Sequence, residues 1–280
     1  MAKIDRKTLL ENGPILMKKC RYGYMMFNRL DEYIGQSLEQ YGEYNGAEGD
    51  FLCGLLSPGQ TVVEVGANIG THTTALAKAV GETGKVIAFE PQPGVFQLLC
   101  ANIAVNNYAQ VATMPVAAGA KPGRSRMPRV DYSKPGNFGA VALNNADDAG
   151  DIVTVGRLDD MLQIKSCRLL KVDAEGMELD TLQGGEELIK RHKPILYVEN
   201  DRKEKSAALI SFIMALGYAP YWHMPLLFRK NNFFENENYI FKRERIASIN
   251  MVCAPPEMKV ANMEKLKIDS PDDWWRDRFK

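Results

Sequence analysis

The chain has 280 residues, 45% of them hydrophobic, which is enough to bury the core of one large α/β domain. Lysine plus arginine and aspartate plus glutamate number 35 each, so no net field draws the chain toward nucleic acid or an anionic membrane. Since the start lacks an apolar signal segment and no apolar run reaches a membrane span, we expect a cytoplasmic protein with no membrane span and no nucleic-acid partner.

The five cysteines are odd in number and widely spaced. They include no Cys-x-x-Cys pair, the spacing typical of zinc sites. The sequence therefore predicts reduced thiols and no metal-binding site, while any metal requirement of the reaction stays open.

Residues 1–60 are predicted to form an accessory segment that packs on the main sheet. Apolar residues on both sides of a short polar stretch at 15–27 are typical of a hairpin. The ranges Asp31–Tyr41 and Ala47–Leu56 have the apolar spacing of helices.

The stretch from Thr61 to Val80 predicts a strand, a glycine turn and a helix. Valines dominate the strand, and Gly66 and Gly70 bracket a turn that lets the backbone approach a ligand closely. The helix Thr71–Val80 places free N–H groups and its positive dipole end at that turn, which favours a carboxylate or a phosphate. This geometry indicates a nucleotide-type ligand site.

The identity of the ligand depends on single residues in and after this turn. A dinucleotide fingerprint requires Gly-x-Gly-x-x-Gly, whereas Asn68 holds the middle position and Gly70 comes one residue early. Glu64 would repel a pyrophosphate but suits the ammonium and sulfonium groups of S-adenosyl-L-methionine. Glu90, at the end of the strand Lys85–Phe89, can accept both hydroxyls of an adenosine ribose. An ordinary strand, turn and helix with a surface acid is the alternative.

The next segment continues the alternation of strand and helix. A helix opens at Pro93 and runs to Asn106, and Val111–Ala118 is predicted to be a third strand. The small residues at its end, Val116–Ala118, suit either contact with an adenine ring or a plain buried strand end. Residues 119–150 are rich in Gly, Pro and Asn, which predicts a long loop or an irregular hairpin beside the site.

A second motif lies in Arg168–Glu178. Its first half is a buried strand, so Asp173 reaches the carboxyl end of the sheet, where ligands bind in open α/β folds. Lys171, Glu175 and Glu178 lie within a few residues of Asp173. Ionisable groups this close together are costly unless they pair with each other or with a ligand, although Glu178 also fits a solvated loop.

The last third of the chain supplies further strands and helices. The pattern predicts a helical region over 179–189, a strand over Pro194–Glu199, a helix over Ala207–Leu216 and final strands at 218–223 and 246–253.

Three other segments have two interpretations each. Glu43 and Tyr44 either line the mouth of the site or belong to a solvated loop, and the aromatic loop Leu226–Tyr239 is either a lid over an acceptor pocket or a packed surface loop. The tail Asp272–Phe279 docks its tryptophans on this chain or on a partner.

These motifs resemble those of the FkbM family of S-adenosylmethionine-dependent methyltransferases. The resemblance rests on Val-Glu-Val-Gly-Ala-Asn-Ile-Gly, Phe-Glu-Pro and Lys-Val-Asp-Ala-Glu-Gly-Met-Glu, in that order. It implies an α/β fold of the class I methyltransferase (Rossmann-like) type, with a seven-stranded, mostly parallel sheet and helices on both faces. We expect an N-terminal accessory segment at 1–60, an S-adenosylmethionine-binding methyltransferase domain at 61–256 and a C-terminal tail at 257–280.

The resemblance also implies O-methylation of a hydroxyl on a sugar or natural product, with a small-molecule or glycan acceptor. It assigns cofactor contacts to residues of the turn and the second strand, and their neighbours complete the predicted set: Glu64, Gly66, Ala67, Asn68, Gly70, Thr71, His72, Glu90, Pro91 and Ala118. Glu64 replaces the aspartate more frequent in the family. A homodimer is compatible with these features.

Methyl transfer to a hydroxyl benefits from a base that removes its proton. Asp173 and Glu175 are assigned to the reaction centre by the resemblance, with Asp173 the first candidate for the base. His223, at a predicted strand end, is either a third candidate or a buried, hydrogen-bonded histidine. Two rival functions remain, an NAD-dependent oxidoreductase and a non-catalytic cofactor-binding module of the same fold.

Overall fold

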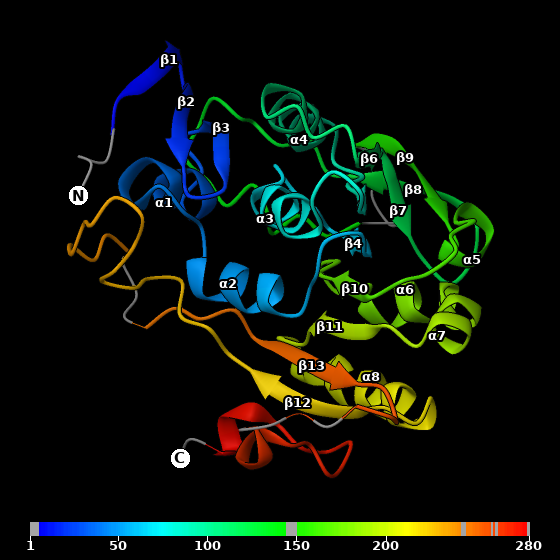
Figure 1. The fold of residues 1–280 in the computed structure, drawn as a ribbon. Coiled ribbons are helices and arrows are strands. Elements are labelled where there is room, and N and C mark those ends of the chain that lie inside the picture. The colour runs from blue at the N-terminus through cyan, green and yellow to red at the C-terminus, as the bar shows by residue number, and fades with distance from the viewer. Residues whose placement is uncertain (1–5, 144–149, 242–244, 259, 261–262, 279–280) are drawn as a thin grey trace.

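The computed structural model describes residues 6–143, 150–241, 245–258, 260 and 263–278. A central twisted sheet has helices on both of its faces, and two smaller sheets lie at its flanks (Figure 1).

The first small sheet is built by β1 (Thr8–Asn12), β2 (Ile15–Cys20) and β3 (Gly23–Asn28), which pair antiparallel in chain order. The predicted hairpin is confirmed as β2 and β3. Strand β1 was not predicted, because nearly all of its side chains, including Leu9 and Leu10, are exposed and leave no alternating pattern.

Helices α1 (Ile34–Tyr41) and α2 (Gly46–Gly54) follow, close to the predicted ranges. Helix α1 begins three residues later than predicted because the Asp31 carboxylate accepts hydrogen bonds from the backbone N–H groups of Tyr33 and Ile34, at 2.9 and 2.7 Å. The side chain of Asn45 accepts from the Glu48 N–H and caps α2.

The central sheet has seven strands in the order β12-β13-β11-β10-β4-β5-β6. Strand β13 pairs antiparallel with both of its neighbours, and the other pairs are parallel. This order confirms the predicted fold class. The strands are β4 (Thr61–Val65), β5 (Lys85–Phe89), β6 (Val111–Met114), β10 (Leu169–Val172), β11 (Ile195–Glu199), β12 (Ala219–His223) and β13 (Asn250–Ala254).

Two apolar layers enclose this sheet. On one face, Leu52 of α2 and Leu76 of α3 pack on Val62. On the other face, Leu182 and Ile210 belong to a layer that includes the alternate residues of the same strands. The helices are α3 (Thr71–Val80), α4 (Pro93–Val105), α5 (Leu158–Met161), α6 (Glu178–Gly184), α7 (Glu186–His192) and α8 (Lys203–Ala215).

The predicted strand Val111–Ala118 is wrong as a single element. It divides into β6, in the central sheet, and β7 (Val116–Ala118), which pairs with β9 (Asp151–Gly156) in the other small sheet. Pro115 stands at the division, where its missing N–H interrupts a hydrogen-bond ladder.

Residues 119–150, predicted to form a long loop or an irregular hairpin, contain a strand, β8 (Gly123–Met127), which pairs antiparallel with β9 just after this range, as in the second alternative. The part of that prediction at 144–149 lies outside the described residues. The helical region predicted over 179–189 forms two helices, α6 and α7, rather than one.

The C-terminal segment lies beside β12 (Figure 1). The Trp274 ring meets the Trp222 ring edge to face, with centroids 6.1 Å apart, and the Trp222 indole N–H donates to Asp273 at 3.1 Å. The tail therefore docks on its own chain. Among the described helices, none combines the length and the apolar composition that crossing a membrane requires.

Candidate active site

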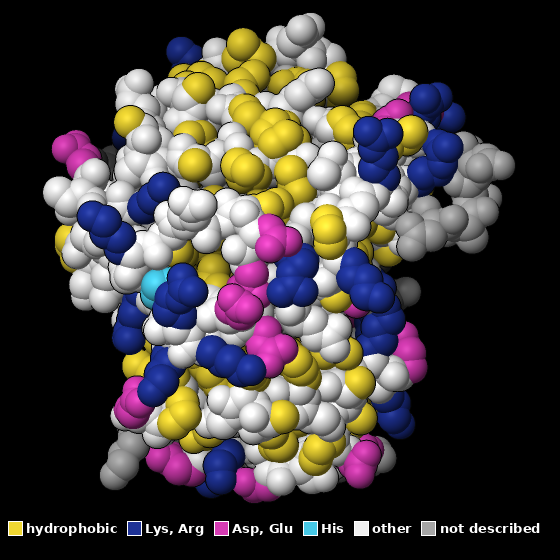
Figure 2. All heavy atoms as spheres, turned by 90° about the vertical axis from the view of Figure 1, so that its right-hand side faces the viewer, with side chains coloured by type: hydrophobic (Ala, Val, Ile, Leu, Met, Phe, Trp, Pro, Cys, Tyr) yellow, Lys and Arg dark blue, Asp and Glu magenta, His cyan; other side chains and the backbone are white. Residues whose placement is uncertain are grey.

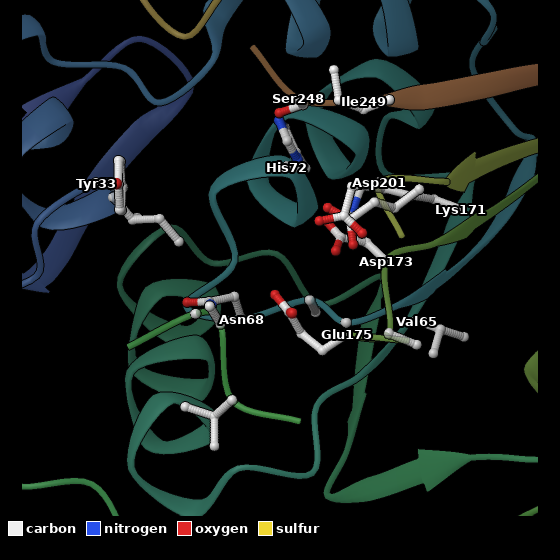
Figure 3. Close-up of a pocket in the computed structure, with 18 of the residues that line it drawn as sticks. Tyr33, Val65, Asn68, His72, Lys171, Asp173, Glu175, Asp201, Ser248 and Ile249 are labelled. Atoms are coloured by element: carbon white, nitrogen blue, oxygen red, sulfur yellow. The ribbon is translucent and has the colours of Figure 1, made fainter. Parts of the chain in front are cut away.

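A cavity of about 800 Å³ lies at the carboxyl ends of β4, β5, β10 and β11. Figure 3 shows Lys171, Asp173 and Asp201 gathered on one side of it and Tyr33 on the opposite side. Its volume is within the range of about 300–1,000 Å³ that small-molecule sites occupy. The cavity brings together most of the predicted site residues: Glu64, Gly66, Ala67, Asn68, Thr71, His72, Glu90, Pro91, Ala118, Asp173 and Glu175.

The glycine turn places the tips of two neighbouring strands in contact. Gly66 has a φ of 78°, and a Cβ added to it would lie 1.6 Å from the carbonyl oxygen of Asp173. Only glycine therefore fits here, on grounds of both backbone conformation and space. Gly70, with a φ of 86°, begins α3 and is not among the residues that line the cavity.

Glu90 closes the turn from the neighbouring strand. One of its carboxylate oxygens accepts the Asn68 N–H and the other accepts the Gln92 N–H, each at 2.8 Å. Burial raises the pKa of Glu90 to about 7, against the opposing effect of these two hydrogen bonds. Each oxygen keeps a lone pair with which it can accept a further hydroxyl.

Glu64 is 1% exposed, and both of its oxygens already have protein partners. The Thr73 hydroxyl donates to one at 2.6 Å, and the Lys171 Nζ lies 3.7 Å from the other. Burial raises the pKa of Glu64, while Lys171 opposes that rise. Direct contact of Glu64 with an ammonium group of a ligand stays a prediction.

Lys171 is a buried cation between two strand tips. Its Nζ lies 3.4 Å from Oδ2 of Asp173 and near Glu64 on the adjacent strand. Burial lowers the pKa of Lys171, but the surrounding carboxylates Asp173, Glu64 and Glu48 raise it further, so the net pKa is above its usual value. Lys171 is therefore charged at neutral pH.

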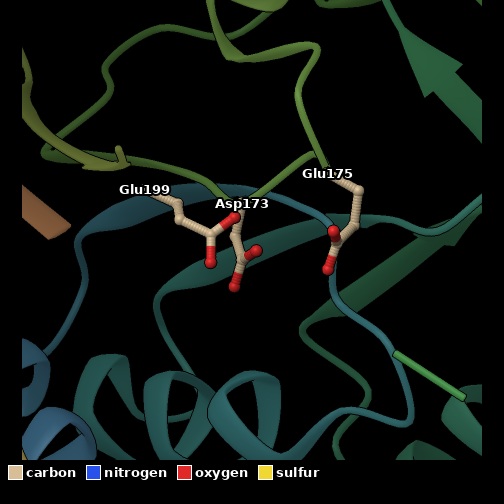
Figure 4. A group of neighbouring side chains, drawn as sticks. All are labelled: Asp173, Glu175 and Glu199. Atoms are coloured by element: carbon tan, nitrogen blue, oxygen red, sulfur yellow. The ribbon is translucent and has the colours of Figure 1, made fainter. Parts of the chain in front are cut away.

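Three carboxylates face one another at the next tips of the sheet: Asp173 after β10, Glu175 in the following turn and Glu199 at the end of β11 (Figure 4). Each offers an oxygen within 4.8 Å of the others, a spacing that one divalent cation can bridge. Sequence spacing did not indicate this group, because Glu199 comes from a different strand.

The environments of these acids differ. Burial raises the pKa of Glu175 to about 7, with Asp173 adding to the rise and Arg202 opposing it. The Arg202 guanidinium donates to Glu175 at 2.9 Å. Burial, followed by repulsion from Asp173 and Asp201, raises the pKa of Glu199 well above its usual value. Protons or a cation therefore relieve the repulsion at this end of the cavity.

His72 lines the cavity from the first turn of α3. It is buried, and its Nε2 has no hydrogen-bond partner in the part of the chain that the structure describes. Burial and then the Lys171 charge lower the pKa of His72 well below its usual value, so the ring is neutral. Buried polar groups are rarely left without a partner, so His72 is a candidate for a ligand contact.

His223 is not among the residues that line the cavity. Its Nδ1 is 2.8 Å from the Tyr197 hydroxyl, and its ring stacks on Phe51 with centroids 4.1 Å apart. Burial lowers the pKa of His223 to about 4. This placement corresponds to the second interpretation from sequence, a buried and hydrogen-bonded histidine.

The loop after β12 combines the two interpretations offered for it. Leu226 and Leu227 line the cavity. Farther along, Arg229 pairs with Glu43 at 2.5 Å and with Asp50 at 2.7 Å, which fixes the loop to α2 and the residues before it. Tyr44, but not Glu43, lines the cavity.

Several lining residues were not assigned to the site from sequence. Asp201 follows Glu199 by two residues, so its position after a strand was a usable signal. The others come from segments far apart in the chain and carry no local signal: Tyr33, Ile34, Met224, Ser248, Ile249, Trp275 and Arg276.

Comparison with known proteins gives one family match. The family model described as "Methyltransferase FkbM domain" matches residues 64–220. Methyltransferase 1 of Beauveria bassiana (strain ARSEF 2860) is 28% identical over an alignment 148 residues long, which covers 44% of this chain and 57% of that protein. The chain thus spans less than two thirds of that relative's length.

Solved structures give distant matches. Methyltransferase FkbM from Methylobacillus flagellatus KT superposes with a TM-score of 0.46 and 17% identity, over 80% of this chain and 55% of that one. Fibrillarin of Aeropyrum pernix, solved with natively bound S-adenosyl-L-methionine, gives a TM-score of 0.43 and 12% identity, over 86% of this chain and 94% of that one.

Proposed function

The chain belongs to the FkbM methyltransferase family, whose cofactor is S-adenosyl-L-methionine, and from this premise we propose that it methylates a hydroxyl of a sugar or natural-product acceptor. The observation that supports the proposal most is the close approach of Gly66 to the backbone carbonyl of Asp173, since the proposed base and the proposed cofactor turn then lie side by side. Both residues line the same cavity.

The residues of the turn fit the cofactor. Gly66 lets the turn pack directly against the Asp173 backbone, Glu90 has lone pairs for the ribose hydroxyls, and His72 offers a ring nitrogen that lacks a partner in the described chain. Ala117 and Ala118 add a small apolar wall. When bound, S-adenosyl-L-methionine supplies an electrophilic methyl carbon.

Asp173 is the proposed base. Its Oδ2 is held by Lys171, whereas Oδ1 has no hydrogen-bond partner among the described residues and is the oxygen assigned to remove the acceptor proton. A positioned base of this kind typically contributes about 10²–10⁴-fold to the rate. Glu175, on the other side of the same cavity end, is the proposed second member of the reaction centre.

The charge distribution supports a small-molecule or glycan acceptor rather than a nucleic acid. In the face that Figure 2 shows, basic and acidic side chains are interspersed over the lower half, and basic side chains gather only at the upper right. The cavity itself is lined by more acids than bases: Glu64, Glu90, Asp173, Glu175, Glu199 and Asp201 against Lys171, Arg245 and Arg276.

Two measurements test the proposal. Calorimetric titration is expected to show saturable binding of S-adenosyl-L-methionine and none of NAD. With radiolabelled S-adenosyl-L-methionine, label is expected in a small-molecule or polysaccharide fraction of cell extract. Cofactor binding without label in any fraction would instead indicate a non-catalytic module, and NAD binding alone would indicate an oxidoreductase.

A further inference from the structure

The hairpin of β12 and β13 continues beyond the central sheet. Three residues past the last pair of these strands, along each chain, Leu226 and Ala247 form a bridge that keeps the antiparallel register. Residues 224–227 and 246–249 therefore form a two-stranded ribbon that extends from the edge of the sheet. Most residues of the ribbon line the cavity, so the ribbon is one of its walls.

The ribbon lies on the acceptor side of the cavity. In the order β12-β13-β11-β10-β4-β5, the cofactor turn belongs to β4 and β5, Asp173 follows β10, and the ribbon extends from β13 and β12 at the far side. The Asn200 N–H, just after β11, donates to the Ile249 carbonyl at 2.8 Å and holds the ribbon beside the acids. Since methyl transfer needs the acceptor opposite the methyl donor, an acceptor hydroxyl at Asp173 has its body toward the ribbon.

The loop at 228–241, called the anchored loop below, crosses from the ribbon to α1 (Figure 1). It is fastened first at Tyr41, the last residue of α1, whose carbonyl accepts the Phe234 N–H at 2.9 Å. The Tyr41 hydroxyl accepts the Ile240 N–H at 3.0 Å and donates to the Asn238 carbonyl at 2.9 Å. Because Tyr41 is 1% exposed, water does not compete for these hydrogen bonds.

A buried ion pair is the second fastening of the anchored loop. The Arg229 guanidinium donates to both oxygens of Glu43, at 2.5 and 3.0 Å, and one of them also accepts the Phe233 N–H at 3.1 Å. Glu43 is 4% exposed, and Asp50 binds another nitrogen of Arg229 at 2.7 Å. A Cβ added to Gly46 would overlap both members of the pair. Removing one member would leave the other charge buried and unpaired, which strongly disfavours the docked loop.

These fastenings are continuous with the cavity wall. Leu227, two residues before Arg229, lines the cavity and belongs to one apolar cluster with Tyr41 and Phe241. Three further residues pack on this cluster and also line the cavity: Tyr33, Tyr44 and Ile246. Displacement of the anchored loop would therefore displace the wall.

We propose that the anchored loop is a fixed wall of the acceptor site rather than a lid, and that Tyr41, Glu43 and Arg229 are positioning residues that hold it at the width the acceptor requires. None of the three lines the cavity, so they act through Leu227 and the ribbon. The inference rests on the proposed methyl transfer, and it gives the N-terminal segment a part in acceptor binding.

The test uses the full-length protein and the cell-extract fraction that accepts label from S-adenosyl-L-[methyl-³H]methionine. Glu43→Gln and Arg229→Gln each remove one charge of the buried pair, and Tyr41→Phe keeps the ring but removes the hydroxyl. The control is Glu186→Gln, which breaks an exposed ion pair with Lys190 on α7, outside the cavity.

We expect the apparent KM for the fraction to rise about fivefold or more in Glu43→Gln and Arg229→Gln, because apparent affinity falls with the fraction of molecules that keep the wall in place. The rise in Tyr41→Phe should be smaller, about twofold to fivefold, since the Tyr41 carbonyl still binds the loop. The kcat and the calorimetric Kd for S-adenosyl-L-methionine should change less than twofold, as should all three values in the control. The double variant Glu43→Gln/Arg229→Gln should have a KM no higher than Arg229→Gln, because both changes break the same contact.

Hydrogen–deuterium exchange tests the fastening without any acceptor. The backbone N–H groups of Phe233 and Phe234 should exchange faster in Glu43→Gln than in the wild type, while those of β12 exchange at the same rate. Unchanged exchange at Phe233 and Phe234 would contradict the proposal. If Glu43→Gln does not fold, the same comparison is made with Tyr41→Phe, at Phe234 and Ile240.

Three kinetic outcomes overturn the inference alone. Unchanged KM in the folded variants would mean that the anchored loop does not shape the acceptor site. A cofactor Kd that rises in parallel with KM would place the wall on the cofactor side. A lower kcat with unchanged KM would indicate only a less stable protein. If the wild type transfers label to no fraction, the proposed function itself fails and this inference with it.

Discussion

The two ends of the cavity are built differently. At the glycine turn, the polar groups satisfy one another, as when Glu90 accepts two backbone N–H groups and Glu64 accepts from Thr73. At the acidic end, Asp173, Glu175 and Glu199 bring carboxylate oxygens within 4.8 Å of one another. The glycine turn is thus held by hydrogen bonds within the protein, apart from the His72 Nε2, which lacks a partner among the described residues, whereas at the acidic end like charges face one another. A hydrogen-bonded turn suits a cofactor that always binds in one pose, and the acidic end suits the groups that act on an acceptor.

The largest expected effect separates chemistry from binding. Asp173→Asn should lower methyl transfer by about 10²–10⁴-fold, because the proposed base is lost while its shape is kept. Cofactor affinity measured by calorimetry should stay within about threefold, since the glycine turn is unchanged. Asp180→Asn, at an exposed position on α6, is the matched control. Unchanged turnover in Asp173→Asn would remove Asp173 from the base role.

The next effect tests the contact between the two ends. In Gly66→Ala the new Cβ would lie 1.6 Å from the carbonyl of Asp173, so one strand tip must move. We expect a loss of about 3 kcal/mol or more in the free energy of unfolding, from strain and displaced backbone, together with weakened cofactor binding. In Gly54→Ala, where a Cβ meets nothing within 4 Å, urea denaturation should show less than about 0.5 kcal/mol of change. Equal stability of the two variants would contradict the close contact.

A pH effect tests the buried carboxylate of the turn. Burial raises the pKa of Glu90 from 4.5 to about 7, so between these values the folded protein binds more protons than the unfolded chain. Its contribution to stability is therefore full below pH 4.5 and falls as pH rises toward 7. Glu90→Gln should remove this pH dependence of the free energy of unfolding. Urea denaturation from pH 5 to 8 should show the free energy of unfolding of the variant rising by up to roughly 3 kcal/mol relative to that of the wild type.

The matched control for that series is Glu204→Gln, at an exposed position in the first turn of α8. It should leave the pH dependence as it is in the wild type. If the free energy of unfolding of Glu90→Gln differed from that of the wild type by the same amount at every pH, Glu90 would be charged over the whole range.

The smallest expected effect concerns a residue outside both ends. His223→Gln retains a hydrogen-bonding group for the Tyr197 hydroxyl, and methyl transfer should stay within about threefold of the wild type. A loss of a hundredfold or more, with the fold intact by circular dichroism, would return His223 to the reaction centre.

The difference between the two ends also explains what the sequence could predict. Glu64, Gly66 and Asn68 follow one another in a single strand and turn, and Glu90 ends the next strand, so local spacing was sufficient for the first end. Asp173 was found in the same way, because it directly follows an apolar strand.

The remainder depends on tertiary structure. Trp275 reaches the cavity only because Trp274 packs on Trp222, a contact that no local pattern contains. Strand β8 has exposed, charged residues and no apolar alternation, and Pro115 divides a strand that otherwise appears continuous. Placement of His223 outside the cavity follows from its partner Tyr197 on another strand.

The packing of Gly66 against the carbonyl of Asp173 has a consequence for the order of events. A ligand that shifts the turn also moves the backbone that carries the Asp173 carboxylate, because the Gly66 and Asp173 segments are in direct van der Waals contact. Binding of the cofactor at the turn therefore affects the orientation of the Asp173 carboxylate, which acts on the acceptor. We therefore expect ordered sequential kinetics in which the cofactor binds before the acceptor. The cofactor-free protein should bind the acceptor only weakly.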